Sequence, residues 1–303
     1  MADRRLQVFH AVAKQMSFTK AAETLFMTQP AVTFQIKQLE EYFNTRLFER
    51  GHGRISLTPA GEVVLEYAER ILALSAELDT RLREMTGRLS GPLLIGASTT
   101  IAEFLLPPLL GEFRSRHPEV QAKLIVGNSE TIENRVAEHT LDIGLIEAPS
   151  HLPVLQTESC CQDELQVIVA PSHPLARQKS VTPRQLVPYP YVSRESGSGT
   201  REFTDLHFRK AGIQPADLNV VMELGSPEAL KGVVATGLGY AIVSRVTVEK
   251  ERKLGDLVAV PLQPRLMRTL SLVYPKERFR SRLLNAFVEF AKERLGGATR
   301  APA

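Results

Sequence analysis

The stretch Phe18-Thr19-Lys20-Ala21-Ala22-Glu23, followed after four residues by Thr28-Gln29-Pro30-Ala31-Val32-Thr33, determines the fold of the N-terminal segment. Each run predicts a short helix. The paired alanines permit close approach of a neighbouring helix, Thr28 suits a helix N-cap, and Pro30 falls in a first turn where its missing N–H costs nothing. Working outward, apolar residues at helical spacing predict a further helix over 4–14 and continue the last helix to Phe43. Two short helices separated by a brief turn predict a helix-turn-helix.

The helix that begins at Thr28 turns a polar face outward. Gln29, Thr33, Gln35 and Lys37 can hydrogen-bond to base edges or phosphates, and no acidic residue follows until Glu40. This pattern favours a helix that enters the major groove of DNA. The alternative is a plain solvated face, which any amphipathic helix possesses.

A hairpin is predicted next. Leu47–Arg50 and Arg54–Leu57 are short runs around the turn Gly51-His52-Gly53, with Arg50 and Arg54 beside its tip. Guanidinium groups there could enter the minor groove or clamp phosphates. The first 60 residues carry eight lysines and arginines against five acidic residues, a surplus that suits a polyanion or an ordinary solvated surface.

Taken together with Gln35-Ile36-Lys37-Gln38-Leu39-Glu40, Leu47-Phe48-Glu49-Arg50 and Leu57-Thr58-Pro59-Ala60-Gly61, these runs resemble the LysR-type transcriptional regulators. The resemblance implies a winged helix-turn-helix over residues 1–60. It also implies double-stranded promoter DNA as the partner. The base contacts it implies are Gln29, Pro30, Thr33 and Gln35, with Lys37, Arg50 and Arg54 near the backbone. Many members carry arginine where this chain has Phe34, which could instead touch a thymine methyl group.

Residues 61–90 are predicted to form a linker helix. Val64, Tyr67, Ile71, Leu74 and Leu78 recur at alternating three- and four-residue spacing, Leu82, Met85 and Leu89 extend the stripe, and Gly87 and Gly91-Pro92 end it. We expect this stripe to pair two chains, although it could also pack on its own chain. The resemblance implies antiparallel linker helices and a homodimer or homotetramer.

Residues 91–303 alternate strand-like and helical runs, which predicts an α/β sheet. The expected strands are 93–96, 121–126, 141–146, 165–170, 191–192, 219–222, 240–243 and 270–274, and the expected helices are 101–117, 129–138, 200–211, 227–236 and 280–295. The resemblance implies a two-lobed, periplasmic-binding-protein-like effector domain. One lobe would comprise residues 92–163 and 265–303, the other residues 164–264, with a ligand between them.

Candidate effector-binding residues follow from their positions at strand ends and helix starts. Hydroxyls and free N–H groups of helix N-termini favour a small anion, although each hydroxyl could serve only as a helix cap. The candidates are Ser98, Thr99, Thr100, Asn128, Ser129, Glu147, Ser196, Ser198, Gly199, Thr200, Arg201 and Ser226. Glu147 would repel an anion unless Arg201 or a ligand cation offset its charge.

Within the family, Gly96-Ala97-Ser98-Thr99-Thr100-Ile101 and Ser196-Gly197-Ser198-Gly199-Thr200-Arg201 resemble the branch that regulates carbon fixation and sulfur assimilation. The implied effectors are phosphorylated or carboxylate metabolites, or sulfur oxyanions.

Other classes of protein fit less well. The sequence shows no complete nucleophile elbow, no H-x-x-x-H metal motif and no apolar run of about 18 residues, so we expect no catalysis, cofactor, metal or membrane association. Adjacent Cys160 and Cys161 predict no disulfide framework, although a redox-responsive hinge is conceivable. With no apolar leader segment, a cytoplasmic location is expected. A cytoplasmic solute-binding protein and an α/β-fold transferase are the alternatives.

Overall fold

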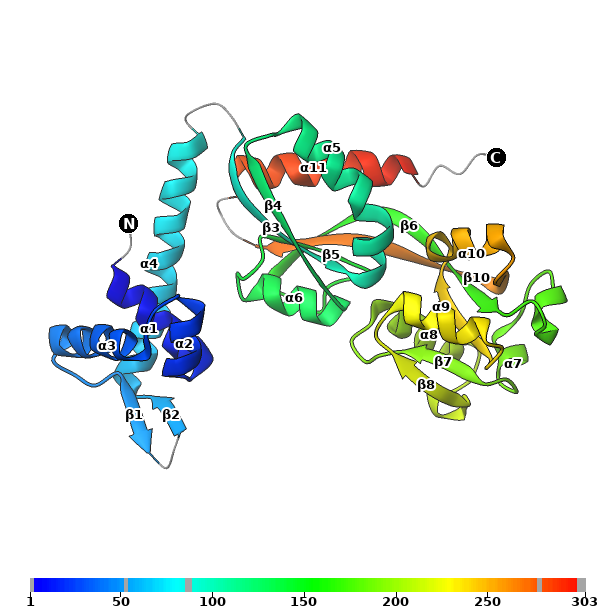
Figure 1. Cartoon of the computed structure of the whole chain (residues 1–303), viewed down its shortest axis with the longest axis horizontal. Coiled ribbons are helices and arrows are strands. Elements are labelled where there is room, and N and C mark those ends of the chain that lie inside the picture. The colour runs from blue at the N-terminus through cyan, green and yellow to red at the C-terminus, as the bar shows by residue number, and fades with distance from the viewer. Residues whose placement is uncertain (1–2, 52–53, 85–88, 277–279, 299–303) are drawn as a thin grey trace. The chain divides into compact units, whose positions relative to one another are not determined.

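A computed structural model describes residues 3–51, 54–84, 89–276 and 280–298 (Figure 1). Met85 and Gly87, predicted to continue and to end the linker helix, lie outside the described residues. The chain forms two compact units, residues 1–88 and 89–303, and each is treated by itself.

The first unit begins with the predicted helices, α1 (Arg4–Gln15), α2 (Phe18–Thr24) and α3 (Gln29–Phe43). The hydroxyls of Ser17 and Thr28 accept hydrogen bonds from the backbone N–H groups of Lys20 and Ala31, at 3.2 and 3.4 Å. Both are N-caps of the kind that Ser and Thr favour, and Pro30 lies in the first turn of α3 as expected.

The predicted hairpin pairs β1 (Phe48–Gly51) with β2 (Arg54–Leu57), and the chain continues into α4 (Pro59–Glu84). Phe9, Val12, Val32 and Ile36 are among the side chains that form the buried core of this unit. Gly61 lets α4 approach the hairpin closely, because a Cβ there would lie 2.2 Å from the carbonyl oxygen of Leu47. The winged helix-turn-helix expected from the sequence is therefore confirmed.

The second unit contains one eight-stranded sheet and its covering helices (Figure 1). In chain order its elements are β3 (Gly91–Ser98), a π-helical turn (Ile101–Leu105), α5 (Leu106–Arg116), β4 (Val120–Gly127), α6 (Ser129–Ala137), β5 (Ile143–Ile146), β6 (Leu155–Val169), α7 (Pro183–Leu186), β7 (Tyr191–Arg194), α8 (Gly199–Lys210), β8 (Val220–Leu224), α9 (Pro227–Ala235), β9 (Tyr240–Ser244), α10 (Glu249–Leu254), β10 (Val258–Pro275) and α11 (Arg282–Ala298), with 3₁₀ turns at Pro174–Arg177, Pro215–Asp217 and Arg245–Val248.

The sheet order β4-β3-β5-β10-β6-β9-β7-β8 divides this unit into two lobes. β3, β4 and β5 pair in parallel at one end, and β7, β8 and β9 pair in parallel at the other. The antiparallel strands β6 and β10 connect the two ends: β10 pairs with β5 of lobe I, and β6 pairs with β9 of lobe II. The two-lobed α/β architecture is thus confirmed.

Several predicted boundaries were wrong. The expected strands 165–170 and 270–274 are parts of much longer strands, β6 and β10, whose polar stretches interrupt the apolar pattern where they cross between the lobes. The helix expected over 101–117 opens with a π-helical turn before α5. The strand expected to begin at Leu141 begins at Ile143, and the last helix runs from Arg282 rather than Arg280.

Candidate functional site

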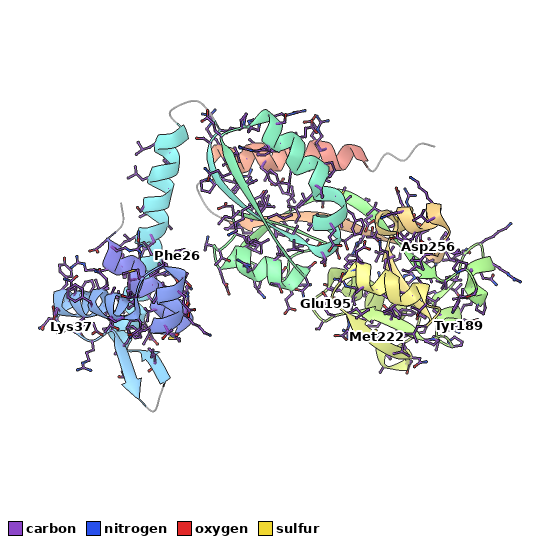
Figure 2. The ribbon with its side chains drawn as sticks, viewed as in Figure 1. Phe26, Lys37, Tyr189, Glu195, Met222 and Asp256 are labelled. Atoms are coloured by element: carbon purple, nitrogen blue, oxygen red, sulfur yellow. The ribbon has the colours of Figure 1, made fainter. Side chains whose placement is uncertain are left out.

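The outer face of α3 is the first candidate site. Val32, Ile36 and Leu39 point into the core, which leaves the opposite face of the helix in solvent. There the Gln29 side-chain amide donates to the Thr33 hydroxyl at 3.0 Å. Figure 2 shows Lys37 on the same helix, where its exposed ammonium pairs with Glu41 at 3.6 Å. This face can therefore offer donors and acceptors to a groove of nucleic acid.

The other predicted DNA contacts are distributed around this face. Pro30 is exposed, Gln35 is half-buried, and Phe34 leaves 57% of its surface in solvent. The backbones of Arg50 and Arg54 lie in paired strands, with Arg50 opposite Ile55. Their side chains lie outside the part of the chain described.

Several of the predicted effector residues lie together where the two lobes meet. The Ser98 hydroxyl donates to Oε1 of Glu147 at 3.0 Å, and the Thr200 hydroxyl donates to Oε2 at 2.9 Å. The Ser129 hydroxyl accepts from the Glu147 backbone N–H at 3.3 Å, and Thr100 also hydrogen-bonds to the Glu147 carboxylate. All five residues are buried.

Arg268, which the sequence reasoning missed, lies at the centre of this cluster. Its Nη1 donates to Oε2 of Glu147 and to the Thr200 hydroxyl, both at 2.8 Å, and its Nε donates to Asp163 at 2.8 Å. Asp163 in turn accepts from Ser244 at 2.6 Å. One guanidinium from β10 therefore joins a lobe I carboxylate, a lobe II hydroxyl and a carboxylate on β6.

The electrostatics favour an ionised Glu147. Burial alone would raise the pKa of this carboxyl group, but the charge of Arg268 and the hydrogen bonds from Thr100 and Thr200, with a contribution from Arg194, lower the pKa to about 2. Of the two cations suggested from the sequence, Arg201 or a ligand cation, Arg201 does not pair with Glu147; Arg268 does. Arg201 instead donates to Glu223 at 2.5 Å and to the Arg194 carbonyl at 3.1 Å.

The start of α8 packs directly against lobe I. A Cβ on Gly199 would lie 2.8 Å from Cβ of Glu147, so this approach requires glycine. The Asn128 amide donates to the Ser196 carbonyl at 3.1 Å, and Asn128 also caps α6. Residues 196–198 and the start of α8 thus bring lobe II into direct contact with lobe I.

A second buried arginine, Arg194, contacts both lobes beside this cluster. It donates to Glu195 at 2.8 Å, to the Thr99 hydroxyl at 3.1 Å and to the Gly225 carbonyl at 3.3 Å. Figure 2 shows Glu195 where lobe II faces lobe I. Ser226 follows Gly225 and caps α9. The Arg194 guanidinium therefore lies beside Thr99 and beside the residue that precedes Ser226.

Ser198 differs from the other predicted hydroxyls. It is 3% exposed, and its Oγ has no hydrogen-bond partner among the described residues. A buried unpaired hydroxyl is costly and is commonly satisfied by a ligand or water.

Arg194, Asp163 and Arg268 were missed because each lies just outside an expected strand, where arginine and aspartate look like surface residues. The available signal was the alternation Leu266-Met267-Arg268-Thr269-Leu270, which places Arg268 on the same face as two buried leucines.

Two other observations concern alternative functions. Within the ranges the structure describes, no group of three or more His, Cys, Asp or Glu side chains could hold a metal ion, and no helix is long and apolar enough to cross a membrane. Cys160 is buried and Cys161 is half-buried, and both are free thiols.

Comparison with known families accounts for most of the chain. Residues 4–62 match the family described as "Bacterial regulatory helix-turn-helix protein, lysR family", and residues 86–296 match "LysR substrate binding domain". The chain is 36% identical over 287 residues to a probable RuBisCO transcriptional regulator of Porphyra purpurea, a match that covers 93% of this chain and 90% of the relative.

Solved structures are also similar. The regulatory domain of CcmR from Synechocystis PCC6803, in complex with 2-PG, is 26% identical with a TM-score of 0.64, covering 71% of this chain and 100% of that one. Full-length CbnR in complex with its target DNA is 24% identical with a TM-score of 0.63, covering 97% of this chain and 100% of that one, and shares the fold.

Proposed function

Because the chain belongs to the LysR family of transcriptional regulators, we propose that α3 reads promoter DNA and that a small anion bound between the two lobes controls this activity. The observation that carries the DNA-binding role is the polar outer face of α3, which lies opposite a fully buried apolar face. The curated relatives named RuBisCO transcriptional regulators favour the carbon-fixation side of the family over sulfur assimilation.

Within this proposal the residues of α3 divide by chemistry. Gln29 and Thr33 form a linked amide–hydroxyl pair suited to base edges, with Pro30, Phe34 and Gln35 beside them. Lys37 contacts phosphate, and we assign the same role to Arg50 and Arg54 of the hairpin.

Fluorescence anisotropy with a promoter fragment and a scrambled fragment tests these roles. Gln29→Ala and Thr33→Ala should each lower the preference for the promoter by about 1–3 kcal/mol. Lys37→Ala should weaken binding to both fragments equally. It should also reduce the slope of log affinity against log salt concentration by about one. Lys123→Ala, an exposed lysine of β4, is the control and should change nothing. Unchanged binding by all three α3 variants would contradict the proposed docking.

We propose that the effector contacts the outer residues of the cleft. The partly or fully exposed residues Thr99, Asn128, Ser196, Arg201 and Ser226 form this set together with the buried Ser198, while Ser98, Thr100, Ser129, Glu147, Gly199 and Thr200 shape the inner end. The unpaired Ser198 hydroxyl supports a ligand there. The binding of 2-PG by the similar CcmR domain supports a small anion.

A thermal-shift panel tests the effector class. It would contain 2-PG, sulfate, sulfite, thiosulfate, phosphorylated sugars and aromatic carboxylates, because a ligand of the native state raises the melting temperature by mass action. An anion that raises the melting temperature of the wild type should not raise that of Ser198→Ala. It should still raise that of Ser180→Ala, because Ser180 lies in lobe II and its hydroxyl bonds to Gln263. A panel without any shift would contradict an anionic effector of these classes.

Pairing of two chains through α4 completes the proposal. Tyr67, Ile71, Leu74, Leu78 and Leu82 keep the predicted spacing, and each is between 46 and 65% exposed in the single chain. A second α4 would cover this stripe in a homodimer, or in a homotetramer built from such dimers. We further propose a cytoplasmic location, since promoter DNA is the partner, and a regulatory rather than an enzymatic role.

A further inference from the structure

We propose that Glu147 is a built-in anion, whose carboxylate fills the innermost anion position of the cleft and thereby confines any effector to the outer residues. This inference rests on the proposed effector site and specifies which part of that site a ligand can reach. The groups that hold the carboxylate are Ser98, Thr100, Thr200 and Arg268, here called the inner cradle.

The inner cradle has the donor set of an anion-binding site. Three hydroxyls and one guanidinium converge on two carboxylate oxygens, with donor distances of 2.8 to 3.0 Å where Ser98, Thr200 and Arg268 donate. Thr200 is the second residue of α8, so the carboxylate also lies at the N-terminus of a 12-residue helix. Charge-assisted bonds and a helix N-terminus are the features by which proteins usually bind free oxyanions and carboxylates. Here the chain supplies the anion itself.

Neither space nor charge leaves room for a second anion. Gly199 lies so close that even a Cβ would come within 2.8 Å of the Glu147 side chain. Glu147, Asp163 and Glu195 carry three negative charges against those of Arg268 and Arg194, so these paired groups have one negative charge in excess. An anionic effector would be repelled from this position and accepted only farther out.

A purely structural clamp would use the same contacts, so the test must separate the two roles. Removing the carboxylate in Glu147→Ala leaves the donors of the inner cradle in place around a carboxylate-sized space. A built-in anion predicts that an external carboxylate can then replace the missing group. A clamp that depends on the covalent link predicts that it cannot.

The experiment is thermal unfolding of the full chain with sodium formate or acetate, against sodium chloride at equal ionic strength. Glu147→Ala should melt below the wild type in chloride and gain a saturating rise of at least about 3 °C with formate. The wild type and Glu147→Gln, whose amide still fills the space, should gain less than about 1 °C. Equal responses of Glu147→Ala to formate and chloride, or an equal formate response in the wild type, would overturn the inference.

If Glu147→Ala does not fold in chloride, refolding replaces melting as the readout. Recovery of folded protein in formate but not in chloride supports the inference, and no recovery in either salt overturns it.

Failure of this inference is distinguishable from failure of the proposed function. If formate stabilises Glu147→Ala but no anion of the panel shifts the melting temperature of the wild type, the inference about Glu147 stands and the proposed effector class is rejected. A panel anion whose wild-type affinity falls at least tenfold in Thr100→Ala would retain the effector and reject its confinement to the outer residues.

Discussion

Nη1 of Arg268 lies 2.8 Å from Oε2 of Glu147, and neither side chain is more than 2% exposed. Arg268 belongs to β10, a strand shared by both lobes, whereas Glu147 follows β5 of lobe I. The same guanidinium also contacts Asp163 at 2.7 Å. An isolated buried charge is costly, so these three groups depend on one another.

Arg268→Met should therefore be strongly destabilising, because it leaves Glu147 and Asp163 buried without a cation. We expect a loss of about 3–5 kcal/mol in the free energy of unfolding, measured by urea denaturation. The matched control is Arg265→Met on the same strand. Arg265 is 73% exposed and lies 3.8 Å from Glu164, so its loss should cost less than about 1 kcal/mol. Equal losses in the two variants would show that the buried ion pair has no special role.

Acid should weaken the Glu147 contacts in a defined range. The folded-state pKa is about 2 against an ordinary value of 4.5, so the group stabilises the fold fully above about pH 4.5. This contribution is lost progressively as the pH falls toward 2. Urea midpoints of the wild type and Glu147→Gln at pH 6, 4 and 3 should therefore converge as the pH falls. A constant difference between the two proteins would contradict an ionised, buried Glu147.

Gly199→Ala should disturb the contact between the lobes. The new Cβ would lie 2.8 Å from Cβ of Glu147 and 2.9 Å from the Ser129 hydroxyl, and overpacking of this kind costs about 1–3 kcal/mol. Gly232→Ala is the control, since a Cβ at that exposed position in α9 would meet nothing within 4 Å. It should stabilise the helix by about 0.5–1 kcal/mol. Differential scanning calorimetry should therefore show a lower melting temperature for Gly199→Ala and a higher one for Gly232→Ala than for the wild type.

Leu74→Glu should separate the proposed dimer, because it places a charge in the middle of the α4 stripe. Burial of one leucine contributes about 1.5–3 kcal/mol, so the dissociation constant measured by sedimentation should rise at least tenfold. Glu66→Gln, off the stripe and exposed, should leave it unchanged. An unaltered association state in Leu74→Glu would place the dimer contact elsewhere.

The first unit could be predicted closely from sequence because its signals are local. Thr28 caps α3 and Pro30 lies in its first turn, as predicted, since caps and first turns depend on neighbours within a few residues. The candidate hydroxyls of the cleft were found for the same reason, from their places at strand ends.

The electrostatic centre of the second unit could not be predicted in this way. Arg268 lies 121 residues from Glu147 and 105 from Asp163, and only the pairing of β6 with β10 brings them together. The lengths of those two strands were underestimated because Gln162, Asp163 and Glu164 read as a polar break rather than as a crossing between lobes.

The long pairing of β6 with β10, which is interrupted at two register shifts, also limits how the lobes can move. Two flexible linkers would let the lobes swing freely, but a hydrogen-bonded ribbon resists bending and restores its own shape. The ribbon should bend most easily at its two register shifts, between Pro261 and Leu266 and between Leu270 and Ser271, where the regular pairing is interrupted. We therefore expect a ligand bound between the lobes to twist this ribbon slightly rather than to swing the lobes freely. The ribbon should return to its original shape when the ligand leaves.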